Sequence, residues 1–429
     1  MTGHLALLLY RALLPVLFLI AFPGWVVKMR RRGGYGTALN ERIGLYFGAA
    51  AFEPSGAIHL HAVSVGETML ALKLLKAWAA EKPGARFVLA TGTATGHHLA
   101  TSAAVPGLRV TYAPLDFPWM IRRYLNRFEP ERLVLIEGEV WPNLLRIAEN
   151  RGVRVDLANA RTSPRSARRL LKFAPALRPF FSKLSSVCIQ EEEHRALWQA
   201  LGIAPENIHL TGSLKFDPES APVPAPDSAF AEKLAAFGNN RPVVLAASTF
   251  PGEEEMLARA IREADPNALP VIVPRHAERR GEVSQALSHA GFSVTLRSSF
   301  SQPASSSPQA FVIDTTGELA TWTAHADAVI IGKSFLSTGG QNPAEAILAR
   351  KPLILGPHMD NFQPLARHLL EKGGALPAHD THSLTLAVRA ALDPRCAVDL
   401  TDKALHVLSA HNGATRRHLL VLQHARPSA

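Results

Sequence analysis

The chain has 429 residues, of which 47% are hydrophobic and 19% charged, and its formal net charge is +10. This length suits two domains of ordinary size, and the composition excludes an intrinsically disordered chain. The positive charge favours an acidic partner without identifying it. Two isolated cysteines, Cys188 and Cys396, exclude a disulfide framework and a thiolate zinc site.

The first thirty residues predict a membrane anchor. From Leu5 to Val27 the chain is apolar except for Arg11, and a helix of that length spans about 34 Å, enough to cross a hydrocarbon core. Basic residues follow the apolar run, whereas a cleaved signal peptide carries them in front. They are Lys28, Arg30, Arg31 and Arg32. The positive-inside rule then predicts a cytoplasmic body. The anchor is expected to span the membrane or to lie in its interface; Arg11, Pro15 and Pro23 favour the alternative of a buried or shallowly inserted helix.

Short apolar runs alternate with amphipathic stretches after the anchor, which predicts two parallel sheets with helices on both faces of each. The strands predicted in the first half are 58–63, 86–91, 109–113, 133–137, 153–158 and 186–190, and the helices between them include 68–80, 141–150 and 191–201. The strands predicted in the second half are 242–247, 269–273, 292–296, 311–314, 328–331 and 353–355.

The stretch 217–227, DPESAPVPAPD, marks the predicted domain boundary, because its prolines cannot continue a helix or a central strand. The predicted organisation is an anchor over 1–32, a Rossmann-like domain over 33–216, the linker, and a second Rossmann-like domain over 228–429. Ligands of open α/β sheets bind outside the carboxyl ends of the strands, so two such domains facing each other would form a deep cleft.

Carboxylates stand at predicted strand ends in the first half. Glu67 follows the first strand near a helix start, where it is a capping acid or, alternatively, a catalytic base. Gly66 before it is expected to permit a tight turn. Glu137 and Glu139 end another strand, where they are either site residues or acids at a helix N-terminus.

The remaining strand-end features favour anions. Lys215, the pair Ser248–Thr249 and Pro274–Arg275 offer hydroxyls and cations next to helix starts, a combination that holds phosphate. Two glycine turns, Gly317 and Gly339–Gly340, are expected to let a ligand approach the backbone. Glu345 is a candidate acceptor for ribose hydroxyls.

The sequence lacks the motifs of several protein classes. The chain has no G-x-G-x-x-G with a following acid, no P-loop and no Asp-x-Asp pair, and its histidines lack metal-ligand spacing. We therefore expect neither a dehydrogenase nor a P-loop kinase, and no metal or cofactor. Basic clusters at Arg122–Arg123 and over 161–172 suit anionic headgroups or a phosphorylated lipid, or are solvated helix faces. No nucleic-acid motif accompanies them, so nucleic acid is not an expected partner.

At these residues the chain resembles the bacterial 3-deoxy-D-manno-octulosonic acid (Kdo) transferases, from the anchor to about residue 362. The motifs that carry the resemblance are Glu41-Arg-Ile-Gly, His61-Ala-Val-Ser-Val-Gly-Glu, Glu137-Gly-Glu-Val-Trp-Pro-Asn, Asn159-Ala-Arg, Thr211-Gly-Ser-Leu-Lys-Phe-Asp, Ala247-Ser-Thr, Pro274-Arg-His, Gly339-Gly-Gln-Asn-Pro and Gly356-Pro-His followed by Asn361-Phe.

The resemblance implies an inverting glycosyltransferase with the GT-B architecture, which moves Kdo from CMP-Kdo to the lipid A precursor of lipopolysaccharide at the bacterial inner membrane. It implies a first domain for the acceptor and a second for the donor. Glu67 matches the general base, and Glu137 and Lys215 match residues that stabilise the transition state. The implied acceptor contacts are Ser64, Gly66 and Arg161. The implied CMP contacts are Ser248, Thr249, Pro274, Arg275, Thr316, Gly317, Glu318, Gly339, Gly340, Asn342, Pro343, Ala344 and Glu345.

The chain departs from the family pattern in places that concern donor binding. The departures are Gly138, Ser213, Lys333, Gln341, Ala344 and Ala346. Three alternatives stay open. A two-lobed sugar-nucleotide epimerase would need neither the anchor nor a basic lipid-facing patch. Another lipid glycosyltransferase would share the fold. A non-catalytic binding protein would tolerate the loss of Glu67, Lys215 and Arg275, which are all present.

Overall fold

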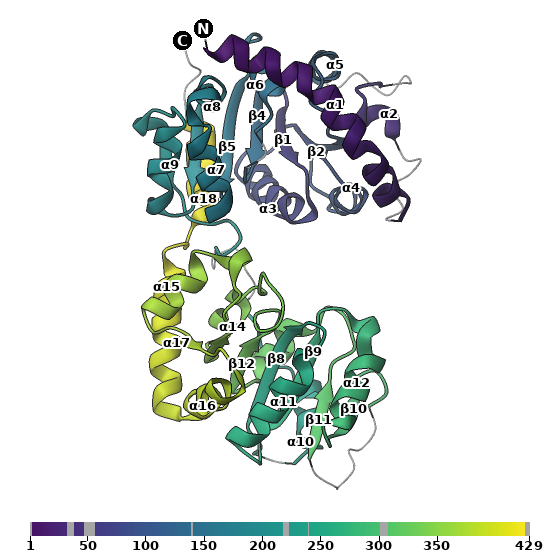
Figure 1. Ribbon diagram of the computed structural model, residues 1–429, viewed down its shortest axis with the longest axis vertical. Helices are drawn as coiled ribbons and strands as arrows, with labels where there is room; N and C mark the ends of the chain where they lie inside the picture. The colour runs from purple at the N-terminus through teal and green to yellow at the C-terminus, as the bar shows by residue number, and fades with distance from the viewer. Residues whose placement is uncertain are drawn as a thin grey trace. The chain divides into compact units, whose positions relative to one another are not determined.

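A computed structural model describes residues 2–31, 38–46, 56–138, 140–217, 223–238, 240–300 and 308–424. The chain forms two compact units, one made of Met1–Ser220 and Gly413–Ala429 and the other of Ala221–Asn412 (Figure 1). Each unit contains one parallel seven-stranded sheet with helices on both faces. The predicted α/β fold class with two doubly wound sheets is confirmed.

The first unit is built on a sheet with the strand order β3-β2-β1-β4-β5-β6-β7. Every residue of β1 and β2 is buried, as expected for parallel strands covered on both faces. The bounds are β1 (Ile58–Ala62), β2 (Phe87–Thr91), β3 (Leu108–Tyr112), β4 (Arg132–Ile136), β5 (Arg154–Ala160), β6 (Ser186–Ile189) and β7 (Ile208–Leu210).

Two hydrophobic cores lie on opposite faces of this sheet. One core joins the sheet to α5 (Pro118–Phe128), α6 (Pro142–Glu149), α8 (Ala174–Phe181) and α9 (Arg195–Ala200). The other joins it to α3 (Val65–Glu81), α4 (Ala94–Thr101) and α18 (Ala414–His424). The short α2 (Leu39–Arg42) and the basic α7 (Pro164–Lys172) complete the unit, with single 3₁₀ turns at Glu192–His194 and Pro205–Asn207.

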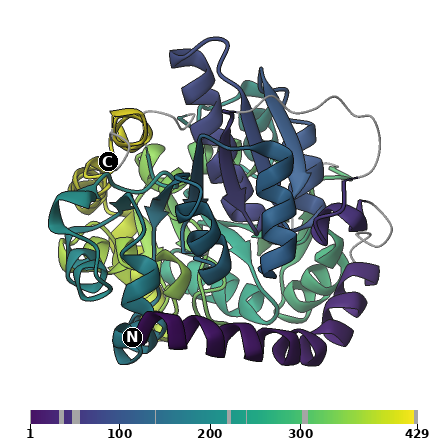
Figure 2. The same ribbon diagram turned by 90° about the horizontal axis from the view of Figure 1, so that it is seen from above.

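The apolar N-terminal segment forms one long helix, α1 (Thr2–Arg31), which lies along the outside of the first unit (Figures 1 and 2). It docks through a stripe at helical spacing: Leu7 is buried, Arg11 Nε donates to Asn143 Oδ1 at 2.7 Å, and the Phe18 ring packs edge-on against Phe117. Tyr10 OH also donates to Asp116 Oδ2 at 2.8 Å. The opposite side of α1 stays exposed, and only 6% of its most apolar window is buried.

The second unit has the strand order β10-β11-β9-β8-β12-β13-β14. Its strands are β8 (Val243–Thr249), β9 (Leu269–Pro274), β10 (Ser293–Leu296), β11 (Gln309–Val312), β12 (Ala328–Ile331), β13 (Leu353–Leu355) and β14 (Leu376–Pro377). Its helices are α10 (Ser228–Ala235), α11 (Glu253–Ala264), α12 (Arg280–His289), α13 (Leu319–His325), α14 (Ala344–Leu348), α15 (Leu365–Glu371), α16 (Thr381–Leu392) and α17 (Pro394–Ser409), with 3₁₀ turns at Ala277–Arg279 and Asp360–Phe362.

The predicted end of the second domain needs a correction. The sequence analysis assigned 228–429 to that domain, but α18 returns to the first unit and packs on α3. Leu419 and Leu422 are buried in the core beside β1 and β2, and the Asp217 carboxylate accepts hydrogen bonds from the backbone of Gly413 and Thr415. An amphipathic helix at a chain end does not reveal in sequence which sheet it covers.

Smaller differences between the predicted and the observed structure concern the sheet edges and the boundaries of the described residues. The structure contains all the predicted strands and adds two that the sequence analysis missed, β7 and β14, which are short and stand at sheet edges. Glu139, Arg32 and the linker residues 218–222 lie outside the described residues. Within the linker, residues 223–227 have no regular structure, and the Asp227 side chain caps α10 by accepting from the Ala229 amide.

Candidate active site

Glu67 lies in the first turn of α3, directly after β1, and it is buried. Its Oε2 accepts from the Val63 amide at 2.8 Å, and its Oε1 accepts from the Ser64 hydroxyl at 2.8 Å. Ser64 caps α3 in return, because its Oγ accepts from the Glu67 amide at 3.2 Å. These hydrogen bonds hold the carboxylate in one orientation at the carboxyl end of β1, next to the helix N-cap Ser64.

The sequence analysis predicted that Gly66 permits a tight turn, but the turn has no need of a glycine. Its φ is not positive, and an added Cβ would meet only Ser64 Oγ, at 3.9 Å. The turn into α3 therefore does not require a glycine. Because Gly66 has no side chain, the helix surface beside Glu67 is open. Gly66 therefore stays a candidate for contact with a ligand.

A second group of predicted residues gathers after β4 and β5. Glu137 has φ +64° at the end of β4, and its carbonyl accepts from the Arg161 amide at 3.1 Å. Asn159 Nδ2 lies 3.5 Å from Glu137 Oε1, and Asn159 Oδ1 accepts from the Leu214 amide at 2.9 Å. Asn159 thereby ties the Glu137 turn to the segment that carries Lys215. β1 and β4 are neighbours in the sheet, so Glu67 and Glu137 follow adjacent strand ends.

Lys215 is the cation of this group. Burial lowers the pKa of its ammonium to about 8, with Arg161 lowering that pKa further and Glu137 raising it. These three charged side chains are therefore close enough to influence one another. The backbone of the preceding residue is fixed from two sides, because Lys73 Nζ also donates to the Leu214 carbonyl at 2.6 Å. The structure thus brings together Glu137, Arg161 and Lys215, which the sequence analysis singled out separately.

In the second unit, the candidate donor residues also follow the strands. Ser248 has φ +57° and is buried at the end of β8 next to Thr249, whose Oγ1 donates to Glu254 Oε1 at 2.9 Å. Arg275 follows β9, its side chain is exposed, and its amide donates to the Thr249 carbonyl at 3.0 Å. The ends of β8 and β9 therefore form one continuous edge that carries hydroxyls and a cation.

The sequence analysis missed the residue that organises this edge. Glu253 is fully buried at the start of α11, and its carboxylate accepts from the amides of Phe250 at 3.0 Å, Lys333 at 2.7 Å and Phe335 at 3.2 Å. It joins the loop after β8 to the loop after β12. The acidic run 253–255 after Gly252 is the sequence signal, but it reads as an ordinary helix start.

Lys333, one of the departures noted in the sequence analysis, follows β12. Its φ is +57°, in the left-handed region that costs a side-chain-bearing residue about 1 kcal/mol or more. Its Nζ lies 4.7 Å from the centre of the Phe250 ring. Lys333 therefore adds a cation beside the Ser248–Thr249 edge.

The Thr316–Gly317–Glu318 turn follows β11, and Gly317 has φ +90°, so it needs the freedom of glycine. Glu318 is engaged within the protein: its Oε1 pairs with Arg297 Nη2 at 3.1 Å, and its Oε2 accepts from Trp322 Nε1 at 3.2 Å. This carboxylate anchors α13. Thr316 is exposed, so it and the backbone of the turn offer the contacts that a ligand would reach.

Gly339 and Gly340 need a different explanation from the predicted one. A Cβ on Gly339 would lie 2.4 Å from Asn361 Nδ2, and a Cβ on Gly340 would lie 2.4 Å from Met359 Sδ. The space is filled by the protein's own 359–361 turn, and Asn361 also donates its amide to the Gly339 carbonyl. Close packing of two loops and the positive φ of both residues require these glycines, and the predicted ligand contact stays a prediction.

One oxygen of the Glu345 carboxylate lacks a hydrogen-bond partner among the described residues. It lies at the start of α14 next to the buried Ala344, and Asn342 Oδ1 accepts from the Ala344 amide at 3.2 Å, with Pro343 between. Burial raises the pKa of the Glu345 carboxyl, and its Oε2 is buried with no hydrogen-bond partner among the described residues. A buried carboxylate oxygen of this kind is costly unless a ligand donates to it.

No group of three or more His, Cys, Asp or Glu side chains is placed to hold a metal ion within the ranges that the structure describes. The independence from metals predicted from the sequence stays a prediction. The strand ends carry the cationic side chains Lys215 in the first unit and Arg275 in the second.

Comparison with known proteins identifies relatives of the whole chain. A family model described as 3-deoxy-D-manno-octulosonic-acid transferase (kdotransferase) matches residues 37–218. A 3-deoxy-D-manno-octulosonic acid transferase of Bordetella pertussis is 36% identical, and the match covers 96% of this chain and 97% of that protein.

Solved structures share the fold at low identity. A putative UDP-N-acetylglucosamine 2-epimerase from Listeria monocytogenes matches with a TM-score of 0.57 and 12% identity, over 86% of this chain and 96% of that one. A glycosyltransferase from Rickettsia africae matches with a TM-score of 0.54 and 12% identity, over 86% of this chain and 100% of that one. The architecture is therefore GT-B, which epimerases and glycosyltransferases share, and the fold alone does not choose between them.

Proposed function

The chain belongs to the 3-deoxy-D-manno-octulosonic acid transferase family, and we propose that it transfers Kdo with inversion from CMP-Kdo to a lipid A precursor. Family membership makes it a glycosyltransferase. In the proposed reaction the oxygen of an acceptor hydroxyl bonds to the anomeric carbon of Kdo while the bond from that carbon to the CMP phosphate breaks. The hydroxyl proton passes to a base, and CMP departs as an anion.

The group of Glu137, Arg161 and Lys215 is the observation that carries the assignment of residue roles. An oxocarbenium-like centre is stabilised by a nearby carboxylate, and negative charge on a departing phosphate is stabilised by a cation. The side chain of Lys215 is exposed, and its pKa near 8 keeps most of its ammonium charged at neutral pH. A cation and a carboxylate that influence each other at one strand end can act on the charges of the transition state.

We assign the base to Glu67. Its carboxylate is fixed by the Val63 amide and the Ser64 hydroxyl, which is the pre-organisation that a base requires. The same contacts also fit a purely structural capping acid. The two roles differ in one respect, because capping needs only hydrogen-bonding atoms, whereas proton removal needs an ionised carboxylate.

We assign the donor to the second unit. Glu345 Oε2 lacks a donor, so ribose hydroxyls of CMP would satisfy it. The Ser248–Thr249 edge, the Arg275 side chain and the turn at Gly317 offer hydroxyls, a cation and backbone amides for phosphate. No metal is part of the proposal.

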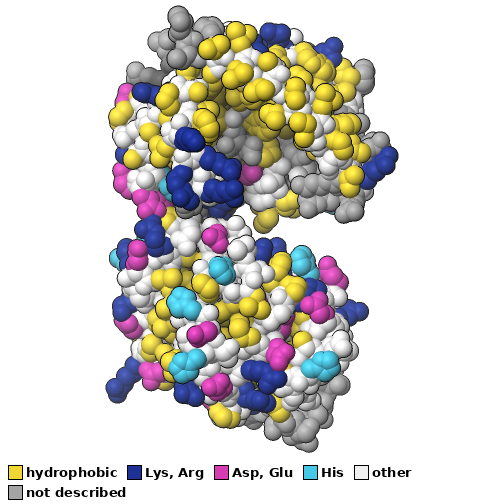
Figure 3. Space-filling view, in the orientation of Figure 1, with side chains coloured by type: hydrophobic (Ala, Val, Ile, Leu, Met, Phe, Trp, Pro, Cys, Tyr) yellow, Lys and Arg dark blue, Asp and Glu magenta, His cyan; other side chains and the backbone are white. Residues whose placement is uncertain are grey.

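We further propose attachment to the cytoplasmic face of the inner membrane through α1. The docking stripe from Leu7 to Phe18 holds the helix against the first unit, which supports a helix lying in the interface over one standing across the bilayer. Hydrophobic side chains cover the surface along α1, and Lys and Arg side chains gather over α7 (Figure 3). Basic residues of this kind attract anionic lipids; on α7 they are Arg165, Arg168, Arg169 and Lys172.

The test measures transfer of radiolabelled Kdo from CMP-Kdo onto a lipid A precursor by the purified protein. Glu67→Gln keeps atoms that can accept from Val63 and pair with Ser64, so the hydrogen bonds at the start of α3 survive and the unfolding temperature should stay near the wild-type value. We expect kcat to fall about 10²–10⁴-fold, because general-base catalysis contributes that much. Equal activity of this variant and the wild type would leave Glu67 a capping acid.

Ser64→Ala is the matched control, because it removes the cap and leaves the carboxylate. It should lower the free energy of unfolding by about 1 kcal/mol and reduce kcat far less than Glu67→Gln does. An epimerase is the second candidate, favoured only by the shared fold. Conversion of a nucleotide sugar without acceptor, together with no labelled lipid from the folded wild type, would replace the transferase proposal with it.

A further inference from the structure

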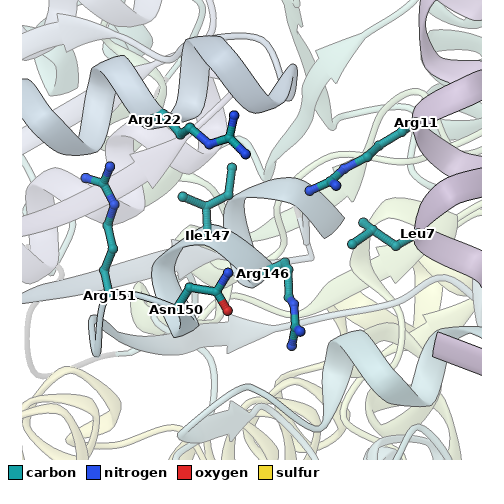
Figure 4. A pocket seen from close by; sticks show the side chains of 7 residues that line it. All are labelled: Leu7, Arg11, Arg122, Arg146, Ile147, Asn150 and Arg151. Carbon is teal, nitrogen blue, oxygen red and sulfur yellow. The ribbon is translucent and has the colours of Figure 1, made fainter. Parts of the chain in front are cut away.

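A basic cavity of about 470 Å³ opens beside α1 in the first unit, and none of the proposed catalytic residues lines it. Four arginines from three helices and one turn line it: Arg11 from α1, Arg122 from α5, Arg146 from α6, and Arg151 from the turn before β5. Figure 4 shows Arg11 and Arg122 extending toward each other across the cavity, with Arg151 on the far side of Ile147.

The positive charge of the cavity is only partly balanced. Arg146 pairs with Glu149 at 2.9 Å, but Lys183 also pairs with that carboxylate at 2.5 Å. Arg11 and Arg151 donate to neutral amide oxygens, those of Asn143 and Asn126. Arg122 is exposed and has no ion-pair partner among the described residues. Like charges held together in this way favour an anion with several oxygens.

The cavity is separated from the proposed reaction centre. Arg151 precedes β5, whereas Asn159 and Arg161 stand at its carboxyl end, and the seven residues of β5 make it about 23 Å long. An anion in the cavity is therefore not the group that reacts beside Lys215.

The surroundings indicate an amphiphile. Leu7 and Arg146 also line a second cavity of about 250 Å³, whose other walls include Leu145, Pro179 and Phe180. Ser182 and Lys183 complete this lining, so the cationic space adjoins a cavity with both apolar and polar walls. Both lie against α1, whose outward face exposes Leu9 and Leu13 at 59% and 47%. A free phosphate ion would use the arginines and leave the apolar walls of both cavities and of α1 uncovered.

We propose that this cavity binds the phosphodiester headgroup of an anionic bilayer phospholipid, with an acyl chain lying along Leu7, Leu145 and Phe180 of the neighbouring cavity. Arg122 and Arg151 contact the headgroup phosphate, and Arg11 couples headgroup binding to the docking of α1. The site fixes the first unit on anionic membranes in addition to the non-specific attraction of its basic surface. It is independent of the proposed Kdo transfer, because none of its residues belongs to the reacting group.

The test is flotation of the full-length protein on two kinds of vesicle, phosphatidylcholine alone and phosphatidylcholine mixed with phosphatidylglycerol. The wild type should bind both through α1 and prefer the anionic vesicles. Arg122→Gln and Arg151→Gln should each lower that preference about fivefold, the effect of roughly 1 kcal/mol per arginine at an anionic surface. Binding to neutral vesicles should not change, which also shows that the variants are folded.

Arg123→Gln is the matched control, since it makes the same charge change on the same helix, while the Arg123 guanidinium lies over the Trp119 ring, 5.2 Å from its centre, and does not line the cavity. It should lower the preference less than twofold. An equal loss in this control would mean diffuse attraction and overturn the proposal. Unchanged binding of both cavity variants would overturn it as well. So would potassium phosphate that abolishes the preference at an ionic strength where potassium chloride does not, because the site would then bind free phosphate.

Discussion

At the scale of single residues, the ionisation of Lys215 sets how activity depends on alkaline pH. Burial lowers its pKa from 10.5 to about 8, so the proposed cation is lost as pH rises through about 8. We therefore expect kcat/KM to fall above that pH. The unfolded chain binds more protons than the folded one between about pH 8 and 10.5, so this group makes folding more favourable over the same range. Activity and stability thus change in opposite directions.

The measurement is kcat/KM for Kdo transfer between neutral pH and about pH 10, with thermal unfolding recorded in parallel. Lys215→Arg is the informative variant, because a guanidinium stays charged throughout this range. It should lower activity at neutral pH and remove the alkaline decline. An alkaline decline of the same midpoint in Lys215→Arg would assign the titration to another group.

Glu345 is expected to reduce stability while it promotes donor binding. Its buried Oε2 lacks a partner, and burial raises the pKa of its carboxyl, so the donor-free protein bears the cost of a desolvated acid. Glu345→Ala should leave the unfolding temperature unchanged or higher and raise the KM for the donor about 10–100-fold, the loss of one hydrogen bond to a charged group.

Glu318→Ala provides the contrast to this variant, because Glu318 is paired with Arg297 and Trp322 and its loss should lower the unfolding temperature. The two unfolding curves, without and with CMP, measure the difference. A large destabilisation by Glu345→Ala without CMP would show that its carboxylate is structural.

At the scale of elements, α18 completes the first unit from the other end of the chain. His418 Nε2 accepts from the Asn159 amide at 3.0 Å, and Arg417 Nε donates to the Thr211 carbonyl at 3.0 Å. The helix therefore supports both the Asn159 turn and the segment leading to Lys215. Deleting 413–429 should raise hydrogen exchange in β5. It should also lower kcat, with a smaller effect on the KM for the donor.

Hydrogen-exchange mass spectrometry of the truncated and full-length proteins checks this, with β8 of the second unit as the internal reference. Protection of β8 should stay unchanged, because α18 belongs to the first unit. Equal loss of protection in β5 and β8 would mean that the helix supports the whole molecule rather than one sheet.

The strands and the residues after them were the parts that sequence could supply. Apolar runs such as Leu133–Ile136 and Val243–Ala247 identify buried parallel strands, and the end of each run places Glu137 or Ser248 at the carboxyl edge. Short-range contacts, such as the one between Ser64 and Glu67 at the start of α3, join residues three apart and also follow from the sequence.

The roles of residues that make contacts across long sequence distances could not be predicted from the sequence. Glu253 joins loops about 80 residues apart, and His418 contacts Asn159 across 259 positions, so no local pattern records either role. Gly339 and Gly340 were correctly noted as special, but their packing partner, the 359–361 turn, is visible only in the structure.

At the scale of the whole molecule, buried neutral histidines make folding sensitive to acid. Burial lowers the pKa values of His59, His61 and His418 to about 3, 4 and 4, all below the ordinary value of 6.5. As pH falls below 6.5, the unfolded chain takes up protons that the folded chain does not, so the stability from these groups is complete above pH 6.5 and is lost toward pH 4. The three lie in the first unit, so that unit should weaken first.

Urea unfolding at pH 7 and pH 5 measures this effect, with hydrogen exchange locating the unit that opens. Each histidine contributes at most about 1.4 kcal/mol per pH unit, so the free energy of unfolding should fall by a few kcal/mol at pH 5. His418→Gln keeps an acceptor for the Asn159 amide and cannot take up a proton, so its acid dependence should be shallower than that of the wild type. Parallel pH curves for the two proteins would show that His418 is not among the groups responsible, and equal stability at both pH values would contradict the acid sensitivity itself.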